Sequence, residues 1–302
     1  MRITNDLNLP APLIAAVSKV RQPVAGQISV TELISPPQLR ALTIKHWEEI
    51  TEDASERLWA AVGSLMHQML ENHAYIPRHQ AERTLSTEVE GINGTGTFDL
   101  FYEDGVLTDY KFVSVWTTMN GVKEEWQQQL NLYAHLLRLT GARVETLQVV
   151  AIYRDWTKSK AFDSNYPSAQ VQTFTVPLWS NEDAENFLLE RVRLHMKTEA
   201  GEVLPCTPKE RWERPTRFAV MKQGQKRAVR VFDTREEAEG NVTKAGLYVE
   251  ERPGASVRCE SYCRVSSFCP QYTRMREEQL ASDNEFKSSS LRTRENSKTS
   301  GV

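Results

Sequence analysis

The strongest structural signal in this chain lies in residues 95–111, Thr95-Gly-Thr-Phe-Asp-Leu-Phe-Tyr-Glu-Asp-Gly-Val-Leu-Thr-Asp-Tyr-Lys111. Two runs rich in aromatic and β-branched residues, 98–102 and 106–112, flank a turn signal, and this pattern predicts a β-hairpin. The loop can hold two residues, 104–105, or three, 103–105. The three-residue loop is a type I turn closed by a left-handed residue, and Gly105 stands where that residue is needed.

The loop length decides which side chains meet across the hairpin. With three loop residues, Asp99 falls opposite Asp109 on the same face of the sheet. With two, Asp99 falls opposite Tyr110 and the carboxylates point to opposite faces, because a slip of one residue inverts a strand. Lys111 shares the face of Asp109, since it follows two residues later.

The three-residue register therefore gathers two carboxylates and an ammonium at one end of the hairpin. Close carboxylates repel each other, and a divalent cation with oxygen ligands offsets this repulsion. A lysine beside such a cation can orient or deprotonate a water molecule and stabilise developing negative charge. The simpler alternative is an exposed hairpin with scattered surface charge.

A helix is predicted upstream of the hairpin, from Glu56 to Asn72. Gly63 and His67 lie one turn apart on it. We expect Gly63 to let the helix approach the sheet closely, so that His67 can reach a metal. The helix also carries an apolar stripe at helical spacing, formed by Leu58, Val62, Leu65 and Met69.

A second helix is predicted downstream, from Gly121 to Thr140. Gln129 and Tyr133 are four residues apart, so their polar ends can reach the same groove. The simpler alternative places Tyr133 in the core and Gln129 on the surface. The predicted buried stripe of this helix consists of Trp126, Leu130, Tyr133 and Leu137.

These motifs together resemble the RecB-like branch of the PD-(D/E)XK nuclease superfamily. Gly96-Thr-Phe-Asp99 followed by Asp109-Tyr-Lys111 resembles its catalytic core, Gly63-Ser-Leu-Met-His67 its Gly-xxx-His motif, and Gln129-Leu-Asn-Leu-Tyr133 its Gln-xxx-Tyr motif. The four motifs come in the family's order, and the resemblance covers about residues 29 to 200. It implies an α/β restriction-endonuclease-like core with a mixed sheet flanked by helices.

The resemblance also implies a role for each motif residue. Asp99, Asp109, His67 and the backbone carbonyl of Tyr110 would hold Mg²⁺ or Mn²⁺. Lys111 would position the attacking water and stabilise the pentavalent phosphate. Gln129 and Tyr133 would contact DNA or order the site. From the residues alone, Glu88 or Glu90 on the strand that leads into the hairpin could also reach the metal or could face solvent.

The implied activity is that of a metal-dependent DNA nuclease, an exonuclease acting on DNA ends or single strands in recombination, repair or phage DNA metabolism. DNA is the implied partner, with recombination or CRISPR adaptation proteins as further partners. The alternatives are a CRISPR spacer-acquisition nuclease and a non-catalytic DNA-end-binding or assembly subunit. The sequence keeps all three residues of the implied catalytic motif, Asp99, Asp109 and Lys111, and this disfavours the non-catalytic alternative. The sequence holds no Gly-xxxx-Gly-Lys-(Ser/Thr) nucleotide-binding loop, so we expect no motor activity.

The four cysteines are a second group of potential metal ligands. Cys206 stands alone, and Cys259, Cys263 and Cys269 follow within eleven residues. Four thiolates can bind an iron–sulfur cluster or zinc. One distant cysteine that joins a tight group of three resembles the iron–sulfur nucleases of the same branch, known from phages and CRISPR systems, although their first pair more often has two residues between the cysteines. The segment Ser35-Pro36-Pro37, where those nucleases often carry their first cluster cysteine, has none. We expect a structural 4Fe-4S cluster, with zinc and metal-free cysteines as alternatives.

Composition restricts the class of protein. The chain has 302 residues, of which 40% are hydrophobic and 25% charged, and its formal net charge is −3. These values are ordinary for a globular protein. Without a signal-peptide pattern or a long apolar run, we expect a cytoplasmic protein that binds no membrane.

The domain organisation follows from these motifs. We expect an irregular N-terminal arm at 1–28, a nuclease core at 29–206 and an inserted α+β module at 207–258. The cysteine segment occupies 259–272, and a charged, serine-rich and disordered tail occupies 273–302.

In the inserted module, strands Arg217–Met221 and Arg227–Phe232 form a predicted hairpin, and Asp233 is the predicted cap of the following helix. The hairpin carries basic residues that could bind phosphates or simply face solvent: Lys222, Lys226, Arg227 and Arg230.

Overall fold

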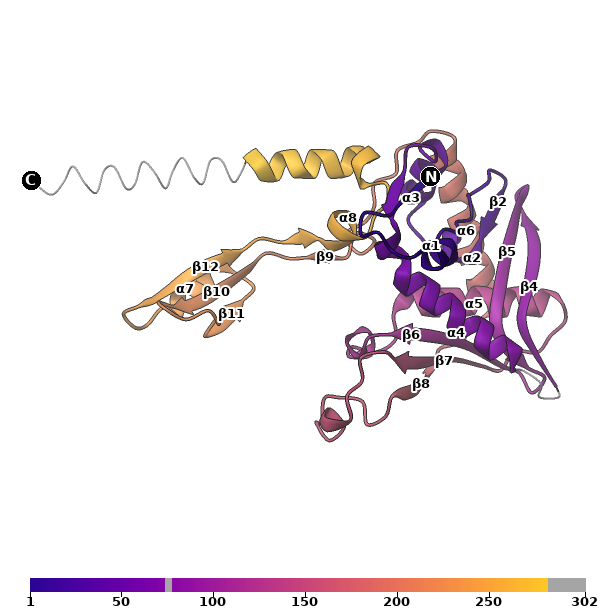
Figure 1. The fold of residues 1–302 in the computed structure, drawn as a ribbon, viewed down its shortest axis with the longest axis horizontal. Coiled ribbons are helices and arrows are strands. Elements are labelled where there is room, and N and C mark those ends of the chain that lie inside the picture. Colours follow the sequence, from indigo (N-terminus) through magenta and orange to yellow (C-terminus); the bar gives the residue numbers. More distant parts are fainter. Residues whose placement is uncertain (74–77, 282–302) are drawn as a thin grey trace, which may run out of the picture. The chain divides into compact units, whose positions relative to one another are not determined.

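The computed structural model describes residues 1–73 and 78–281. The chain forms two compact units, Met1–Leu204 and Pro205–Val302, and each is described here by itself (Figure 1). Within the described ranges, no helix combines the length and the apolar character needed to cross a bilayer.

The first unit is built on a mixed six-stranded sheet flanked by helices, which confirms the predicted mixed α/β class. The strand order is β2-β5-β6-β7-β8, and β4 pairs with β5 outside that path. The strands are β2 (Gln27–Ser29), β4 (His79–Val89), β5 (Ile92–Tyr102), β6 (Val106–Val113), β7 (Thr146–Tyr153) and β8 (Val171–Val176).

Strand β5 has three neighbours, and this opens the sheet beside its middle. Strand β4 pairs with β5 along nearly its whole length. On the other side, β2 pairs only with residues 93–95, whereas β6 pairs only with residues 100–101. Between these two short ladders, no strand among the described residues pairs with β5 on that side. Gly96 and Asp99 both lie in this interval.

Helices cover this sheet and complete the first unit. Helix α5 packs on β4, β5, β6 and β7, and its predicted apolar stripe is buried in the main core. Helix α4 contacts β6. The helices are α1 (Ala11–Val17), α2 (Val30–Leu33), α3 (Pro37–Lys45), α4 (Leu58–Asn72), α5 (Glu124–Leu139) and α6 (Asn181–Glu199), with short 3₁₀ helices η1 (Ala54–Arg57), η2 (Val115–Thr118) and η3 (Lys158–Lys160).

Gly96 brings helix α5 into close contact with strand β5. A Cβ atom at Gly96 would lie 2.9 Å from side-chain carbons of both Tyr133 and Leu136. Only a residue without a side chain permits this approach. Gly96 therefore determines how closely α5 packs on β5, and with it the distance from the sheet of the polar α5 residues Gln129 and Tyr133.

Local capping signals account for several helix ends. Ser29 forms a capping box with Glu32 at the start of α2, Pro37 occupies the first turn of α3, and Ser180 accepts a hydrogen bond from the Asp183 amide at the start of α6. Serine is favoured at helix N-caps and proline in the first turn, so local sequence explains each of these three helix starts.

The second unit contains a small three-stranded sheet with the order β11-β10-β12 and one helix packed on it. Its elements are β9 (Glu213–Arg214), β10 (Arg217–Lys222), β11 (Arg230–Phe232), α7 (Arg235–Gly240), β12 (Leu247–Arg252), β13 (Ala255–Ser256), α8 (Val257–Ser261) and η4 (Ser266–Phe268). The chain enters and leaves this sheet through the paired strands β9 and β13.

Several sequence predictions were wrong in detail. The N-terminal arm is not irregular throughout, since it holds β1 (Arg2–Thr4), which pairs with β3 (Thr51–Asp53), and also α1. Thr234, not Asp233, caps α7 through its side chain, because Asp233 forms an ion pair with Arg217 instead.

Boundaries also differ in the C-terminal half. The first unit ends at Leu204, whereas the predicted core ends at residue 206. Residues 270–281 are helical, so the prediction of a disordered tail from residue 273 was wrong for 273–281. The rest of the predicted tail lies outside the described residues.

We predict that Gly96→Ala destabilises the protein by about 1 to 3 kcal/mol, because the added methyl group overlaps Tyr133 and Leu136. Gly94→Ala is the matched control on the same strand, since its Cβ would meet Thr87 atoms only at 3.5 and 3.7 Å. Urea unfolding followed by circular dichroism measures both variants. Equal stability of the two variants would contradict the close approach of α5.

Candidate functional site

The hairpin of β5 and β6 has the three-residue loop on which the site depends. Leu100 pairs with Thr108 and Phe101 with Leu107. Gly105 has a φ of 94°, and its amide donates to the Tyr102 carbonyl at 2.9 Å. The loop is therefore 103–105, which is the three-residue alternative.

Continuing this register places Asp99 opposite Asp109, where the strands separate. The Tyr110 amide donates to Asp99 Oδ2 at 2.7 Å, so a carboxylate takes the place of the next ladder bond. Lys111 Nζ lies 2.7 Å from Asp109 Oδ2. Apart from this ammonium, Asp109 Oδ2 has no hydrogen-bonding partner among the described residues. Both carboxylates and the lysine therefore converge at the opening beside β5.

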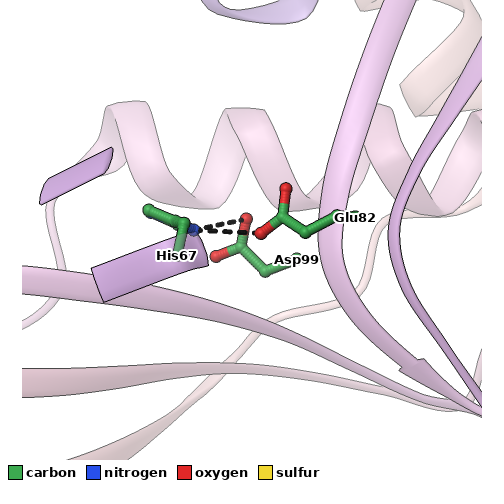
Figure 2. A group of neighbouring side chains, drawn as sticks. All are labelled: His67, Glu82 and Asp99. Carbon is green, nitrogen blue, oxygen red and sulfur yellow. Dashed lines mark hydrogen bonds and ion pairs between the residues drawn. The ribbon is translucent and has the colours of Figure 1, made fainter. Parts of the chain in front are cut away.

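Helix α4 and strand β4 add two more groups. His67 Nδ1 lies 3.4 Å from Asp99 Oδ1 and 3.3 Å from Glu82 Oε1, and Figure 2 shows the two carboxylates directed at the imidazole. One potential ligand atom from each of His67, Glu82 and Asp99 lies within 4.8 Å of the other two. Asp109 is not part of this tight group, but the register of the hairpin puts it opposite Asp99, and its charge raises the pKa of both His67 and Asp99.

Glu82 is the site residue that sequence reasoning missed. It lies opposite Asp99 but is left out of the β4–β5 ladder, which pairs Ala81 with Leu100 and Arg83 with Phe98. Its φ is 47°, a conformation that a non-glycine residue rarely adopts within a strand. Such strain occurs at functional sites, and here it directs the carboxylate toward His67.

A signal for Glu82 was present in the sequence. Val89 pairs with Ile92, so Glu90-Gly91 is a two-residue turn, and both of its residues have positive φ. Counting back from this turn places Glu82 opposite Asp99. The two acids that sequence reasoning considered lie elsewhere: Glu88 is exposed, and Glu90 pairs with Arg193.

Gln129 and Tyr133 form a hydrogen-bonded chain behind Lys111. Lys111 Nζ donates to Gln129 Oε1 at 2.9 Å, and Gln129 Nε2 donates to the Tyr133 hydroxyl at 2.9 Å. Tyr133 is only 5% exposed. Both residues are thus placed to hold the lysine in position, and their predicted contact with DNA stays a prediction.

The electrostatics of the site favour protonation when no cation is bound. Burial, followed by repulsion from Asp109, raises the pKa of Asp99 to about 7. The hydrogen bond that His67 donates to Glu82, together with the charges of Asp99 and Asp109, raises the pKa of His67, although burial opposes this shift. The site therefore carries more negative charge than its surroundings compensate at neutral pH.

The helix that carries His67 differs from its prediction. A Cβ at Gly63 would meet no atom within 4 Å, so this glycine does not allow a close approach to the sheet, and that explanation was wrong. None of the residues of α4 is fully buried. Leu65 and Met69 of the apolar stripe are 62% and 47% exposed, so this part of the stripe lies outside the core.

The four cysteines all lie in the second unit, where they form no disulfide. The side-chain amide of Gln271 bonds both the amide and the carbonyl of Cys206, which ties this residue to the segment after Cys269. Burial, followed by the charge of Glu210, raises the pKa of the Cys206 thiol to about 12.

The predicted phosphate-binding residues of the second unit are Lys222, Lys226 and Arg227, and all three are exposed around the β10–β11 loop. A role in DNA binding stays a prediction.

Comparison with models of known protein families gives no match, and comparison with curated proteins gives none either. Among solved structures, the chain is similar to the crystal structure of SSO0001, with 19% identity, a TM-score of 0.43, and coverage of 66% of this chain and 87% of the other. It is also similar to a candidate exonuclease from Eubacterium rectale, with 14% identity, a TM-score of 0.31, and coverage of 54% of this chain and 56% of the other. At these TM-scores, neither similarity identifies the fold or activity of this chain.

We predict that, in EDTA, the wild-type protein loses stability relative to Asp99→Asn as the pH rises from 5 to 8. The folded state holds the Asp99 proton up to a pKa of about 7, whereas the ordinary value is 3.8. The stabilisation by this proton is therefore full below the ordinary pKa and is lost as the pH rises through 7, by about 2 kcal/mol. Asparagine resembles the protonated acid at every pH.

Urea unfolding of both proteins at each pH measures this difference. A stability difference that does not change between pH 5 and pH 8 would show that Asp99 titrates normally.

Proposed function

We propose that the chain is a divalent-metal-dependent DNA nuclease of the PD-(D/E)XK type with a restriction-endonuclease-like core. The observation that carries this proposal is the convergence of Asp99, Asp109 and Lys111 where β5 and β6 separate. Two carboxylates and an ammonium in this arrangement suit phosphodiester hydrolysis. The carboxylates can hold a cation, and the ammonium can act on the phosphate or the water.

The donor set fits a hard divalent cation. Asp109 Oδ2 is buried and has only the lysine as a partner among the described residues. Asp99 and Asp109 would hold Mg²⁺ or Mn²⁺ together with His67, and Glu82 lies close enough to join them. When bound, the metal would polarise the phosphate and lower the pKa of a water ligand.

Lys111 has the position expected of a general base or an electrostatic stabiliser. Its ammonium is shared between Asp109 and Gln129, at 2.7 and 2.9 Å. Tyr133 in turn fixes Gln129, so the lysine has a defined direction before substrate arrives. Positioned charges of this kind stabilise the pentavalent phosphate without reorganisation during the reaction.

We further propose that the four cysteines hold a 4Fe-4S cluster. The support for this proposal is the grouping of the thiols: all four belong to the second unit, and three of them lie within eleven residues. Thiolates are soft ligands that suit an iron–sulfur cluster. Such a cluster would stabilise the second unit by closing the chain between Cys206 and Cys269.

We predict that Asp109→Asn and Lys111→Ala each lower the rate of DNA cleavage by at least about a hundredfold, because each removes a charge at the reacting phosphate. End-labelled single- and double-stranded DNA in Mn²⁺, with EDTA as the blank, measures this loss. Glu88→Gln is the matched control, since Glu88 is an exposed acid on the neighbouring strand β4. Near-wild-type turnover in either site variant would refute the nuclease assignment.

We predict that protein purified without oxygen is brown and contains about four irons per chain, since the proposed cluster is of the 4Fe-4S type. Iron analysis and visible absorption measure this content, and Cys263→Ala should reduce it strongly. Colourless protein with one zinc per chain would contradict the cluster and support the zinc alternative.

A further inference from the structure

One side of helix α4 carries a row of three residues, each one turn from the next: Trp59, Gly63 and His67. The Trp59 side chain is 59% exposed. A Cβ at Gly63 would meet no atom within 4 Å. The row therefore has an open aromatic ring at one end, a gap in the middle and a candidate metal ligand at the other end, about 12 Å away along the helix axis.

Trp59 stacks against an arginine that directly follows strand β7 (Thr146–Tyr153). The Arg154 guanidinium carbon lies 4.2 Å from the centroid of the Trp59 ring. The Arg154 amide donates to the Val113 carbonyl at 2.9 Å, so Arg154 is fixed beside the last residue of β6. Lys111 precedes Val113 by only two residues. The pair of Trp59 and Arg154 is therefore anchored to the same strand end that carries the proposed catalytic lysine.

This pair has the chemistry of a site for an unpaired nucleobase. An indole ring that an arginine covers on one side can still stack a base, and such stacking tolerates any base because every base has a π face. No ion pair joins Arg154 to a carboxylate within residues 1–73 and 78–281, so its charge is available to a phosphate. In duplex DNA the faces of internal bases are covered by their neighbours, so this chemistry selects a single strand.

We propose that Trp59, supported by Arg154, stacks an unpaired base of single-stranded DNA, and that the strand passes over Gly63 toward the site at His67. This inference rests on the proposed nuclease function and narrows its substrate to DNA with an unpaired segment. A protein partner fits this row less well, because an arginine without an ion pair among the described residues and an open space beside the candidate metal site both favour a charged backbone.

Binding of a short oligodeoxythymidine strand in Ca²⁺, followed by fluorescence anisotropy, tests the proposal apart from catalysis. Trp59→Ala should bind about tenfold more weakly, since one base stack is lost. Trp59→Phe keeps a ring and should recover most of the affinity. Leu65→Ala, an exposed apolar residue on another side of the same helix, is the matched control and should bind as the wild type does.

Gly63→Leu is a second test, which blocks the proposed path of the strand and leaves the Trp59–Arg154 pair intact. The open space around Gly63 accepts a side chain and leucine favours a helix, so the variant should fold, yet its side chain should obstruct the strand and weaken binding. Circular dichroism and thermal unfolding confirm the fold of each variant.

The outcomes separate this inference from the proposed activity. If the wild type cleaves DNA in Mn²⁺ but Trp59→Ala and Gly63→Leu bind the single strand normally, the stacking site is wrong and the nuclease stands. If the wild type binds the strand through Trp59 but never cleaves it, the stacking site stands and the nuclease is wrong. A wild type that prefers blunt duplex to the single strand would also overturn the stacking site.

Discussion

The register of the β5–β6 hairpin is the constraint on which the rest of the site depends. It is fixed by Gly105, whose φ of 94° closes a three-residue loop. A side chain there would also overlap its surroundings, since a Cβ would lie 2.7 Å from Glu145 Cγ and 3.0 Å from the Arg143 carbonyl oxygen. The Gly105 carbonyl accepts from the amides of Glu145 and Thr146, so the same residue also aligns the start of β7.

This register has an electrostatic cost that the fold only partly offsets. It places Asp99 opposite Asp109 at a buried position, and burial with mutual repulsion raises the pKa of Asp99. The Tyr110 amide, the Lys111 ammonium and the His67 imidazole each stabilise part of the charge. These groups do not fully compensate the two carboxylates, and such an excess of negative charge favours the binding of a cation.

Much of this arrangement could be predicted from the sequence because it depends on local rules. The turn chemistry around Gly105 and the period of two along a strand determine which side chains share a face. The buried stripe of α5 followed from helical spacing, and its residues lie in the main core. Glu82 was missed because the turn at Glu90-Gly91 was not used to set the register of β4.

What could not be predicted depends on contacts between distant segments. Periodicity shows that α4 has an apolar stripe, but it does not show whether another layer covers that stripe, and Leu65 is left exposed. The Gly63 spacing suggested close packing, whereas the space around it is open. The approach of α5 to Gly96 likewise becomes visible only when both elements are in place. Local pattern thus located the candidate site, and long-range packing determined its surroundings.

Anomalous diffraction from crystals soaked in Mn²⁺ can locate a metal bound at the β5–β6 hairpin, because the signal gives the position of the ion without reference to activity. We expect a peak coordinated by both Asp99 and Asp109, with His67 as a further ligand. A peak that lacks either aspartate, or saturating Mn²⁺ that leaves this position empty, would refute a metal site at this hairpin.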